Sequence, residues 1–233
     1  IREELVMSLS STLVTEQNLL DATPRHARKI NIKHPILANE ELARLRRVSI
    51  DGLASETIPM LFPAREGAEG LKRALDEICR RASDAIRRGV TILILSDRGV
   101  DEGNAPIPSL LAMAAVHHHL IRERTRTRAG IVVESGEARE VMHFALLIGY
   151  GAGAVNPYLA FRTLERMCGD SVLPESIDPK KAVQNYVKAI DKGLLKVISK
   201  MGISTIQSYR GAQIFEAIGL DSELVDRYFT GTA

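Results

Sequence analysis

The chain has 233 residues, of which 45% are hydrophobic and 26% charged, a composition typical of a globular protein that can bury one sizeable core. Because 31 Lys and Arg residues nearly balance 29 Asp and Glu residues, the formal net charge is +2 and gives no reason to expect a nucleic-acid or membrane partner. Aromatic residues make up only 4% of the chain and Trp is absent, which removes the stacking platforms of single-strand binders.

Cysteine use predicts a reducing compartment. Cys79 lies in an amphipathic helical pattern and Cys168 near a predicted helix end, which favours two free thiols over a disulfide. No apolar run approaches the ~20 residues of a membrane span, and no segment resembles a signal peptide. We expect a cytoplasmic protein without a membrane partner.

The N-terminal part of the chain predicts a connector. It looks irregular, and Pro35 makes the segment KINIKHPIL extended or turned. Residues 40–47 predict one or two helical turns. We expect residues 1–47 to wrap on an α/β body formed by residues 48–233, the two making a single domain overall.

Strands and helices alternate along the body. After two short strands over 48–50 and 57–62, apolar residues recur at three- and four-residue steps in a long amphipathic helix. These helix positions are Leu71, Leu75, Ile78, Cys79, Ala82 and Ile86. The next predicted elements are strands over 91–96, 130–133 and 154–155 and helices over 109–124, over 138–148 and through Met167. This order predicts parallel strands, in a closed barrel or an open doubly wound sheet.

The C-terminal part is predicted to be mainly helical. A loop over 169–179 precedes a long helix over 180–200, which we expect to be interrupted at Gly193. A strand over 202–206 and two short helices complete the chain.

Polar residues follow the predicted strands, most clearly in the segment 90–100, VTILILSDRGV, where a buried apolar run ends in charged residues. The carboxyl ends of parallel strands share one edge of a sheet, so we expect these side chains to form a polar rim. The predicted rim is Asp97, Arg98, Glu134, Ser135, Asn156 and Gln207. Three roles are open for this rim: it binds a ligand, its side chains pair with one another, or it faces a neighbouring domain. We interpret Asp97 and Arg98 as a structural ion pair.

Other motifs favour structural roles. Three consecutive histidines, 117–119, cannot converge from one helix on a single ion, so we predict no metal site there. The glycines of 149–154 follow a helix and precede a strand, the reverse of a dinucleotide fingerprint, which favours helix capping. The arginines of 122–128 are typical of the C-terminal end of a helix. The alternative is that they contact a phosphate or an acidic partner. Lys200 also sits at a helix end, although a Schiff-base role remains open.

Several segments closely resemble the central region of the large (alpha) subunit of glutamate synthase. They are 34–37, 92–100, 105–120, 132–150, 155–164 and 192–220, of which the last, KGLLKVISKMGISTIQSYRGAQIFEAIGL, is the longest. The resemblance covers essentially the whole chain. It implies an incomplete (β/α) TIM-barrel-like domain, and the missing nucleotide-fold signature favours the same α/β architecture.

The resemblance also implies a function. Glutamate synthase makes two glutamates from glutamine and 2-oxoglutarate with reductant from NAD(P)H or ferredoxin. Its amidotransferase domain releases ammonia, its FMN and iron-sulfur domain reduces the intermediate, and the central domain connects them and helps enclose the ammonia route. The implied partners are therefore the amidotransferase and FMN-binding domains, with a reductase subunit or ferredoxin for the full enzyme.

The sequence omits the family's catalytic parts. Neither cysteine is N-terminal, and no cysteine cluster could hold an iron-sulfur centre. We therefore predict no catalytic, cofactor-binding or metal residues in this part of the enzyme. The alternative is a free-standing FMN- or phosphate-binding (β/α) barrel that uses residues 199–204, and a Schiff-base enzyme using Lys200 is a third hypothesis.

Overall fold

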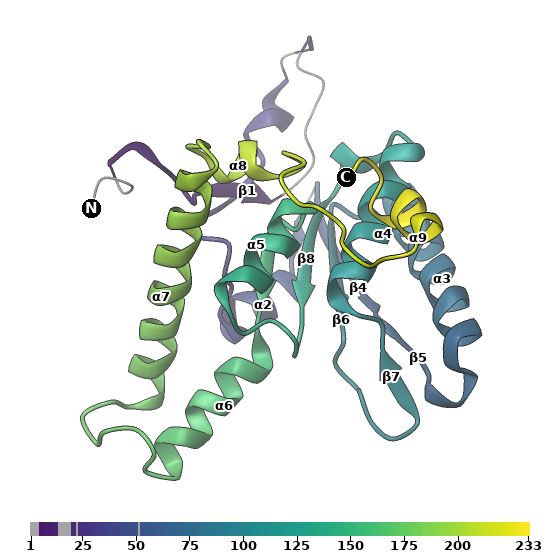
Figure 1. The fold of residues 1–233 in the computed structure, drawn as a ribbon. Helices are drawn as coiled ribbons and strands as arrows, with labels where there is room; N and C mark the ends of the chain where they lie inside the picture. The colour runs from purple at the N-terminus through teal and green to yellow at the C-terminus, as the bar shows by residue number, and fades with distance from the viewer. Residues whose placement is uncertain (1–4, 14–19, 22, 51) are drawn as a thin grey trace.

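The computed structural model describes residues 5–13, 20–21, 23–50 and 52–233. At its centre is a five-stranded sheet in the order β3-β4-β6-β8-β9 (Figure 1). These strands are β3 (Ser49–Ile50), β4 (Leu53–Pro59), β6 (Ile92–Ser96), β8 (Gly130–Glu134) and β9 (Ala154–Asn156). β3 and β4 pair antiparallel, whereas β4-β6, β6-β8 and β8-β9 are parallel. Within the described residues the sheet stays open, which confirms the prediction of an α/β fold with parallel strands and an incomplete barrel.

A helix follows each parallel strand in the predicted alternation, and three more helices come after the last strand. They are α3 (Gly67–Arg87), α4 (Ser109–Arg122), α5 (Val141–Gly149), α6 (Tyr158–Gly169), α7 (Pro179–Lys200), α8 (Ile206–Tyr209) and α9 (Ser222–Tyr228). Short 3-10 turns lie at η1 (Pro24–Ala27), η2 (Ala64–Glu66) and η3 (Arg126–Arg128). Figure 1 shows α6 and α7 extending to one side of the sheet and α3, α4 and α9 gathered at the other.

Both faces of the sheet are buried at β6, β8 and β9, each against a different part of the chain. Successive side chains of a strand point to opposite faces. In β6, Leu93 and Leu95 therefore join the core formed with α3, α4, α5 and α7, whereas Ile92 and Ile94 join a second core. That second core is made with the N-terminal residues, including Leu13, which is 0% exposed.

The N-terminal segment thus covers the face that would be the interior of a closed barrel. It contains the antiparallel pair β1 (Ser11–Leu13) and β2 (Ile30–Ile32) and the helix α2 (Asn39–Arg46). The amide of Val155 in β9 donates to the carbonyl of Pro35 at 2.7 Å. In a (β/α) barrel the helices that follow the strands lie outside them, so the face opposite α3, α4 and α5 corresponds to the interior. Of the predicted connector 1–47, residues 1–4, 14–19 and 22 lie outside the described residues.

Three predicted elements need correction. Residues 202–206 form no strand: Thr205 makes only an isolated bridge to Ser8, because no strand of the sheet lies beside it. The strand expected over 57–62 is split at Met60 into the end of β4 and β5 (Leu61–Pro63). β5 pairs antiparallel with β7 (Asn104–Pro106), a strand that the sequence did not predict.

The interruption predicted at Gly193 is also wrong, because α7 runs unbroken through this residue. The glycine is required by close packing instead: a Cβ atom at Gly193 would lie 2.2 Å from Cγ2 of Val141 in α5. The absence of a side chain therefore lets α7 approach α5 rather than ending the helix.

We expect Gly193→Ala to lower the free energy of unfolding in spite of alanine's better helix propensity. Overpacking costs about 1–3 kcal/mol, whereas the propensity gain is at most about 1 kcal/mol. Urea denaturation of Gly193→Ala and of the double variant with Val141→Ala measures the coupling, and the double variant should lose less than the sum of the single losses. Gly169→Ala is the control, since a Cβ atom there meets nothing within 4 Å; equal effects at both glycines would contradict the packing explanation.

Candidate functional site at the strand ends

The ends of β6, β8 and β9 bring their polar residues side by side. In the parallel register Ser96 lies opposite Glu134, and Glu134 lies opposite Asn156. Five of the six predicted rim residues, 97, 98, 134, 135 and 156, follow or end these strands and lie at this edge. We call these five residues together with Arg46 and Tyr158 the strand-end cluster.

Glu134 is the centre of the strand-end cluster. Its side chain is 0% exposed, and its carboxylate accepts hydrogen bonds from the hydroxyl of Ser96, from Nε of Arg98 at 2.8 Å and from the guanidinium of Arg46. The arginine side chains remain 49% exposed at Arg98 and 36% exposed at Arg46. A buried carboxylate is tolerated when it is paired and hydrogen-bonded, so Glu134 has the partners that its burial requires.

Arg46 was not predicted, and Arg98 has a different partner from the one expected. Arg46 comes from the last turn of α2, so its contact ties the N-terminal segment to the end of β8. Within the described residues Arg98 forms its salt bridge with Glu134 rather than with Asp97. The guanidinium carbon of Arg98 also lies 3.9 Å from the ring centroid of Tyr158. The interpretation of Asp97 and Arg98 as an ion pair is therefore wrong.

Asp97 is buried and held mainly by neutral donors. It is 2% exposed and accepts hydrogen bonds from the amide of Gly136 at 2.8 Å and the hydroxyl of Ser135 at 3.0 Å. Burial raises the pKa of Asp97, and the hydrogen bonds from Gly136, Tyr158 and Ser135 partly offset this. Burial and the nearby Asp97 charge raise the pKa of Tyr158 to about 12. The phenol therefore stays protonated and able to donate at neutral pH.

Asn156 and Ser135 connect the strand ends to other elements. The side-chain amide of Asn156 donates to the carbonyl of Leu37 at 2.8 Å and to Oδ1 of Asn39 at 3.0 Å, both in the N-terminal segment. The hydroxyl of Ser135 lies 2.6 Å from that of Ser109 at the start of α4. The strand-end cluster thus joins α2, three strands and α4. Its geometry fits a structural role, in which it holds these elements together, better than an open acid-base site.

Gln207 does not belong to this edge. It lies in α8, where its Oε1 accepts from Nη1 of Arg210 at 3.0 Å and from the hydroxyl of Ser11 at 3.1 Å. Together with Gly130 and Gly153, which lie at or just before the amino ends of β8 and β9, it lines a cavity. The predicted strand over 202–206 does not form, so nothing delivers Gln207 to the carboxyl edge.

The remaining candidates lie apart from one another. His117 accepts from Nε of Arg126 at 2.8 Å, whereas Nε2 of His119 lies 2.8 Å from the hydroxyl of Ser83, so these two histidines face different partners. Burial, with help from the Arg126 charge, lowers the pKa of His117 to about 3. No group of His, Cys, Asp or Glu among the described residues could hold a metal ion. Lys200 is exposed at the last position of α7 rather than inside a barrel.

The helix-capping interpretation of the glycine segment is confirmed. Gly151 follows the end of α5 with φ at +106°, and its amide donates to the carbonyl of Ile148 at 2.9 Å. A Cβ atom at Gly151 would lie 2.3 Å from Nδ1 of His117, so this position also needs glycine for close approach.

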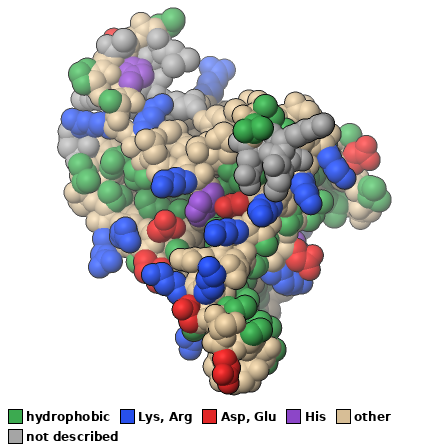
Figure 2. Space-filling view, turned by 90° about the vertical axis from the view of Figure 1, so that its left-hand side faces the viewer, with side chains coloured by type: hydrophobic (Ala, Val, Ile, Leu, Met, Phe, Trp, Pro, Cys, Tyr) green, Lys and Arg blue, Asp and Glu red, His purple; other side chains and the backbone are tan. Residues whose placement is uncertain are grey.

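The molecular face in Figure 2 shows Lys and Arg side chains spread among acidic and apolar ones. Their distribution agrees with the nearly balanced charge of the chain. In the part of the chain that the structure describes, no helix has both the length and the apolar character needed to cross a membrane.

The open α/β body with parallel strands, together with the buried strand-end cluster, places this chain in the class of incomplete barrel domains. The family model for the glutamate synthase central domain matches residues 1–221, and the chain belongs to this family. It is 49% identical over 233 residues to the glutamate synthase [NADPH] large chain of Bacillus subtilis, covering 100% of this chain and 15% of that protein. It is 41% identical over 243 residues to the ferredoxin-dependent glutamate synthase of Pyropia yezoensis, covering 100% of this chain and 16% of that protein.

The chain thus spans a small part of the curated relatives that it matches. Among solved structures, a flavocytochrome b2 variant with sulfite bound is similar with a TM-score of 0.48 and 12% identity, covering 82% of this chain and 44% of that chain. A likeness at this level says nothing about a flavin site in this chain.

Proposed function

We propose that this chain is the connecting, non-catalytic domain of a glutamate synthase, an enzyme that forms two glutamates from glutamine and 2-oxoglutarate. The observation that carries the proposal is the pair of salt bridges that the buried Glu134 forms with Arg46 and Arg98. Active sites of barrel enzymes lie at the carboxyl ends of the strands. Here the domain's own side chains and α2 occupy that place, which favours a structural role over a flavin or Schiff-base site.

The proposed partners are the amidotransferase and FMN-binding domains of the same enzyme, with a reductase subunit or ferredoxin as the electron source. The relatives support this range, since their names include NADPH-, NADH- and ferredoxin-dependent glutamate synthases. FMN and the iron-sulfur cluster are proposed to lie in other domains. The free thiols of Cys79 and Cys168 support a reducing location such as the cytoplasm.

A domain that helps enclose an ammonia route must hold its walls in place, because ammonia that meets water is lost by escape and protonation. We expect Arg46→Ala in the full-length enzyme to loosen α2 from the strand ends. The amount of free ammonia released per glutamine hydrolysed should rise several-fold, while synthesis from added ammonia stays near the parent rate.

Arg80→Ala is the matched control, because Arg80 is an exposed α3 arginine whose salt bridges are to Glu77 and Asp84 on the same helix. Assays of glutamine hydrolysis, glutamate formation and free ammonia measure the coupling. An unchanged ammonia ratio in a folded Arg46→Ala enzyme would count against a role of this domain in enclosing the route.

A further inference from the structure

A cavity of about 290 Å³ opens between the start of α4, the loop that joins β8 to α5, and α5 itself. We call it the α4–α5 cavity. It lies next to the strand-end cluster, because Ser109 lines it and contacts the hydroxyl of Ser135. Every residue that lines it belongs to the described part of the chain. Small-ligand sites are typically about 300–1,000 Å³, so this volume suits a compact ligand.

The floor of the α4–α5 cavity is apolar. It is made by Leu110 of α4, Ala138 of the loop, and Leu146 and Leu147 of α5. Ala138 and Leu147 are buried, whereas Leu110 and Leu146 are partly exposed. An apolar group placed in the cavity would therefore remove further leucine surface from water, which favours binding.

The loop that forms the rim of the cavity is held by hydrogen bonds at both ends. Oε2 of Glu137 accepts from the amide of Ser109 at 2.8 Å. The amide of Arg139 donates to Nδ1 of His143 at 3.2 Å, and its carbonyl accepts from the hydroxyl of Tyr186 at 3.0 Å. A rim whose backbone is fixed in advance loses little conformational entropy when a ligand binds.

Three polar groups at the cavity keep free hydrogen-bonding capacity. Within the described residues, neither Oε1 of Glu137 nor the guanidinium of Arg139 has a partner, so these opposite charges do not pair with each other. Nδ1 of His143 accepts from the amides of Arg139 and Glu140, both at 3.2 Å. An Nδ1 that accepts hydrogen bonds carries no proton, so the ring proton lies on Nε2 and is available to a ligand.

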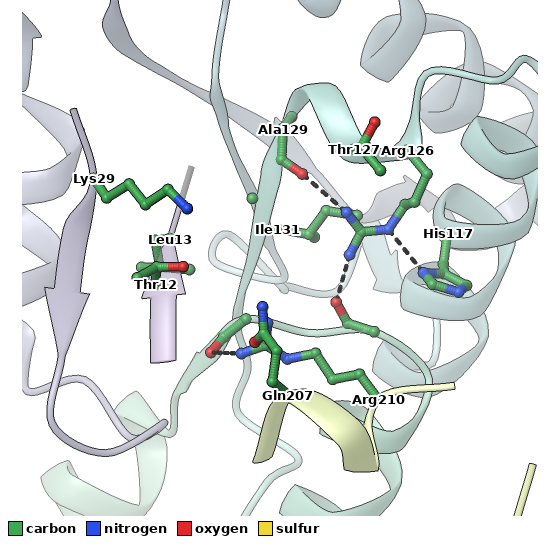
Figure 3. A pocket seen from close by; sticks show the side chains of 13 residues that line it. Thr12, Leu13, Lys29, His117, Arg126, Thr127, Ala129, Ile131, Gln207 and Arg210 are labelled. Carbon is green, nitrogen blue, oxygen red and sulfur yellow. Dashed lines mark hydrogen bonds between the residues drawn. The ribbon is translucent and has the colours of Figure 1, made fainter. Parts of the chain in front are cut away.

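The cavity at the amino ends of β8 and β9 shows the opposite situation (Figure 3). There the Arg126 guanidinium donates to His117 at 2.8 Å and to the carbonyls of Ala129 at 2.9 Å and Gly151 at 2.7 Å. All three nitrogens of that guanidinium are engaged with the protein itself. Arg126 thus joins η3 to its surroundings, whereas Arg139 keeps its donors for a ligand.

We propose that the α4–α5 cavity binds a free α-amino acid with an apolar side chain. The Arg139 guanidinium and Nε2 of His143 match the carboxylate of such a ligand, and Oε1 of Glu137 matches its ammonium group. The leucines of the floor receive the side chain. One glutamate and one arginine line the cavity, and this pair of opposite charges complements a zwitterion better than a simple anion or cation. The proposal does not depend on the connecting role of the domain.

Isothermal titration of the chain with L-leucine tests the proposal. Two probes each lack one charged group: isocaproate has no amino group, and isoamylamine has no carboxylate. We expect saturable binding of leucine and about tenfold weaker binding of either probe, as the loss of one charge-assisted hydrogen bond implies.

Arg139→Gln identifies which group of the ligand the arginine contacts. Arg139 is exposed and its backbone hydrogen bonds survive the substitution, so the variant should fold. Leucine binding should weaken about tenfold in this variant. The affinity for isoamylamine should stay the same, because this probe has no carboxylate for the arginine to bind.

Arg162→Gln is the matched control, since Arg162 is an exposed arginine of α6 that does not line the cavity. It should bind leucine as the parent protein does. No saturable binding of leucine, undiminished binding by Arg139→Gln, or an equal loss in Arg162→Gln would overturn the proposal. Isocaproate or isoamylamine binding as tight as that of leucine would overturn the assignment of an amino acid as the ligand.

Discussion

Replacing Glu134 with alanine is expected to lower the free energy of unfolding by about 3 kcal/mol, near the low end of the range for breaking a buried ion pair. The substitution removes the acceptor shared by Ser96, Arg98 and Arg46 and leaves a hole at the strand end. The loss stays near the low end because both arginines are partly exposed and can turn toward water.

Urea denaturation with linear extrapolation measures this loss. The control is Glu77→Ala, which removes an exposed carboxylate paired with Arg80 on the same helix. Exposed ion pairs contribute little, so the control should change stability only slightly. If Glu134→Ala is as stable as Glu77→Ala, the strand-end cluster does not hold α2 and the strand ends together.

Replacing Leu13 with alanine is expected to cost about 2–5 kcal/mol, the range for truncating a buried leucine. Leu13 is 0% exposed and shares a core with Ile94 and Val132 on the face of the sheet that the N-terminal segment covers. Gly153 makes room for it, since a Cβ atom there would lie 2.4 Å from Cδ2 of Leu13. The large loss follows if the N-terminal segment is an integral cover of the sheet.

Leu5→Ala is the control, because Leu5 is 86% exposed and also belongs to the N-terminal segment. Thermal and urea unfolding, with limited proteolysis of the segment, compare the two variants. Should Leu13→Ala behave like Leu5→Ala, the N-terminal segment would be a loosely attached linker rather than part of the core.

The parallel strands and most of the polar rim were predictable because the signals are local. Apolar runs that end in charged residues mark buried strands, and parallel order places their ends at one edge. This reasoning found Asp97, Glu134 and Asn156. It failed for Gln207, because apolar residues over 202–206 look like a strand, yet Ile206 is buried in α8 instead.

Partners that are remote in sequence were not predictable. Arg46 is 88 residues from Glu134, and a basic residue in the last helical turn already has an ordinary explanation in the helix dipole. Gly193 shows the same limit, since its reason lies in Val141 on another helix. The covering of the barrel-interior face by the N-terminal segment likewise depends on tertiary packing, which periodicity along one segment does not report.

The most direct test of the central claim is a titration of the purified chain with FMN, followed by visible absorbance and flavin fluorescence. The claim is that the domain's own side chains occupy the strand ends where a barrel enzyme would hold its cofactor. We therefore predict a colourless protein and no saturable change in FMN fluorescence. A yellow protein, or saturable quenching at micromolar FMN, would contradict the claim and make this domain a flavin-binding barrel.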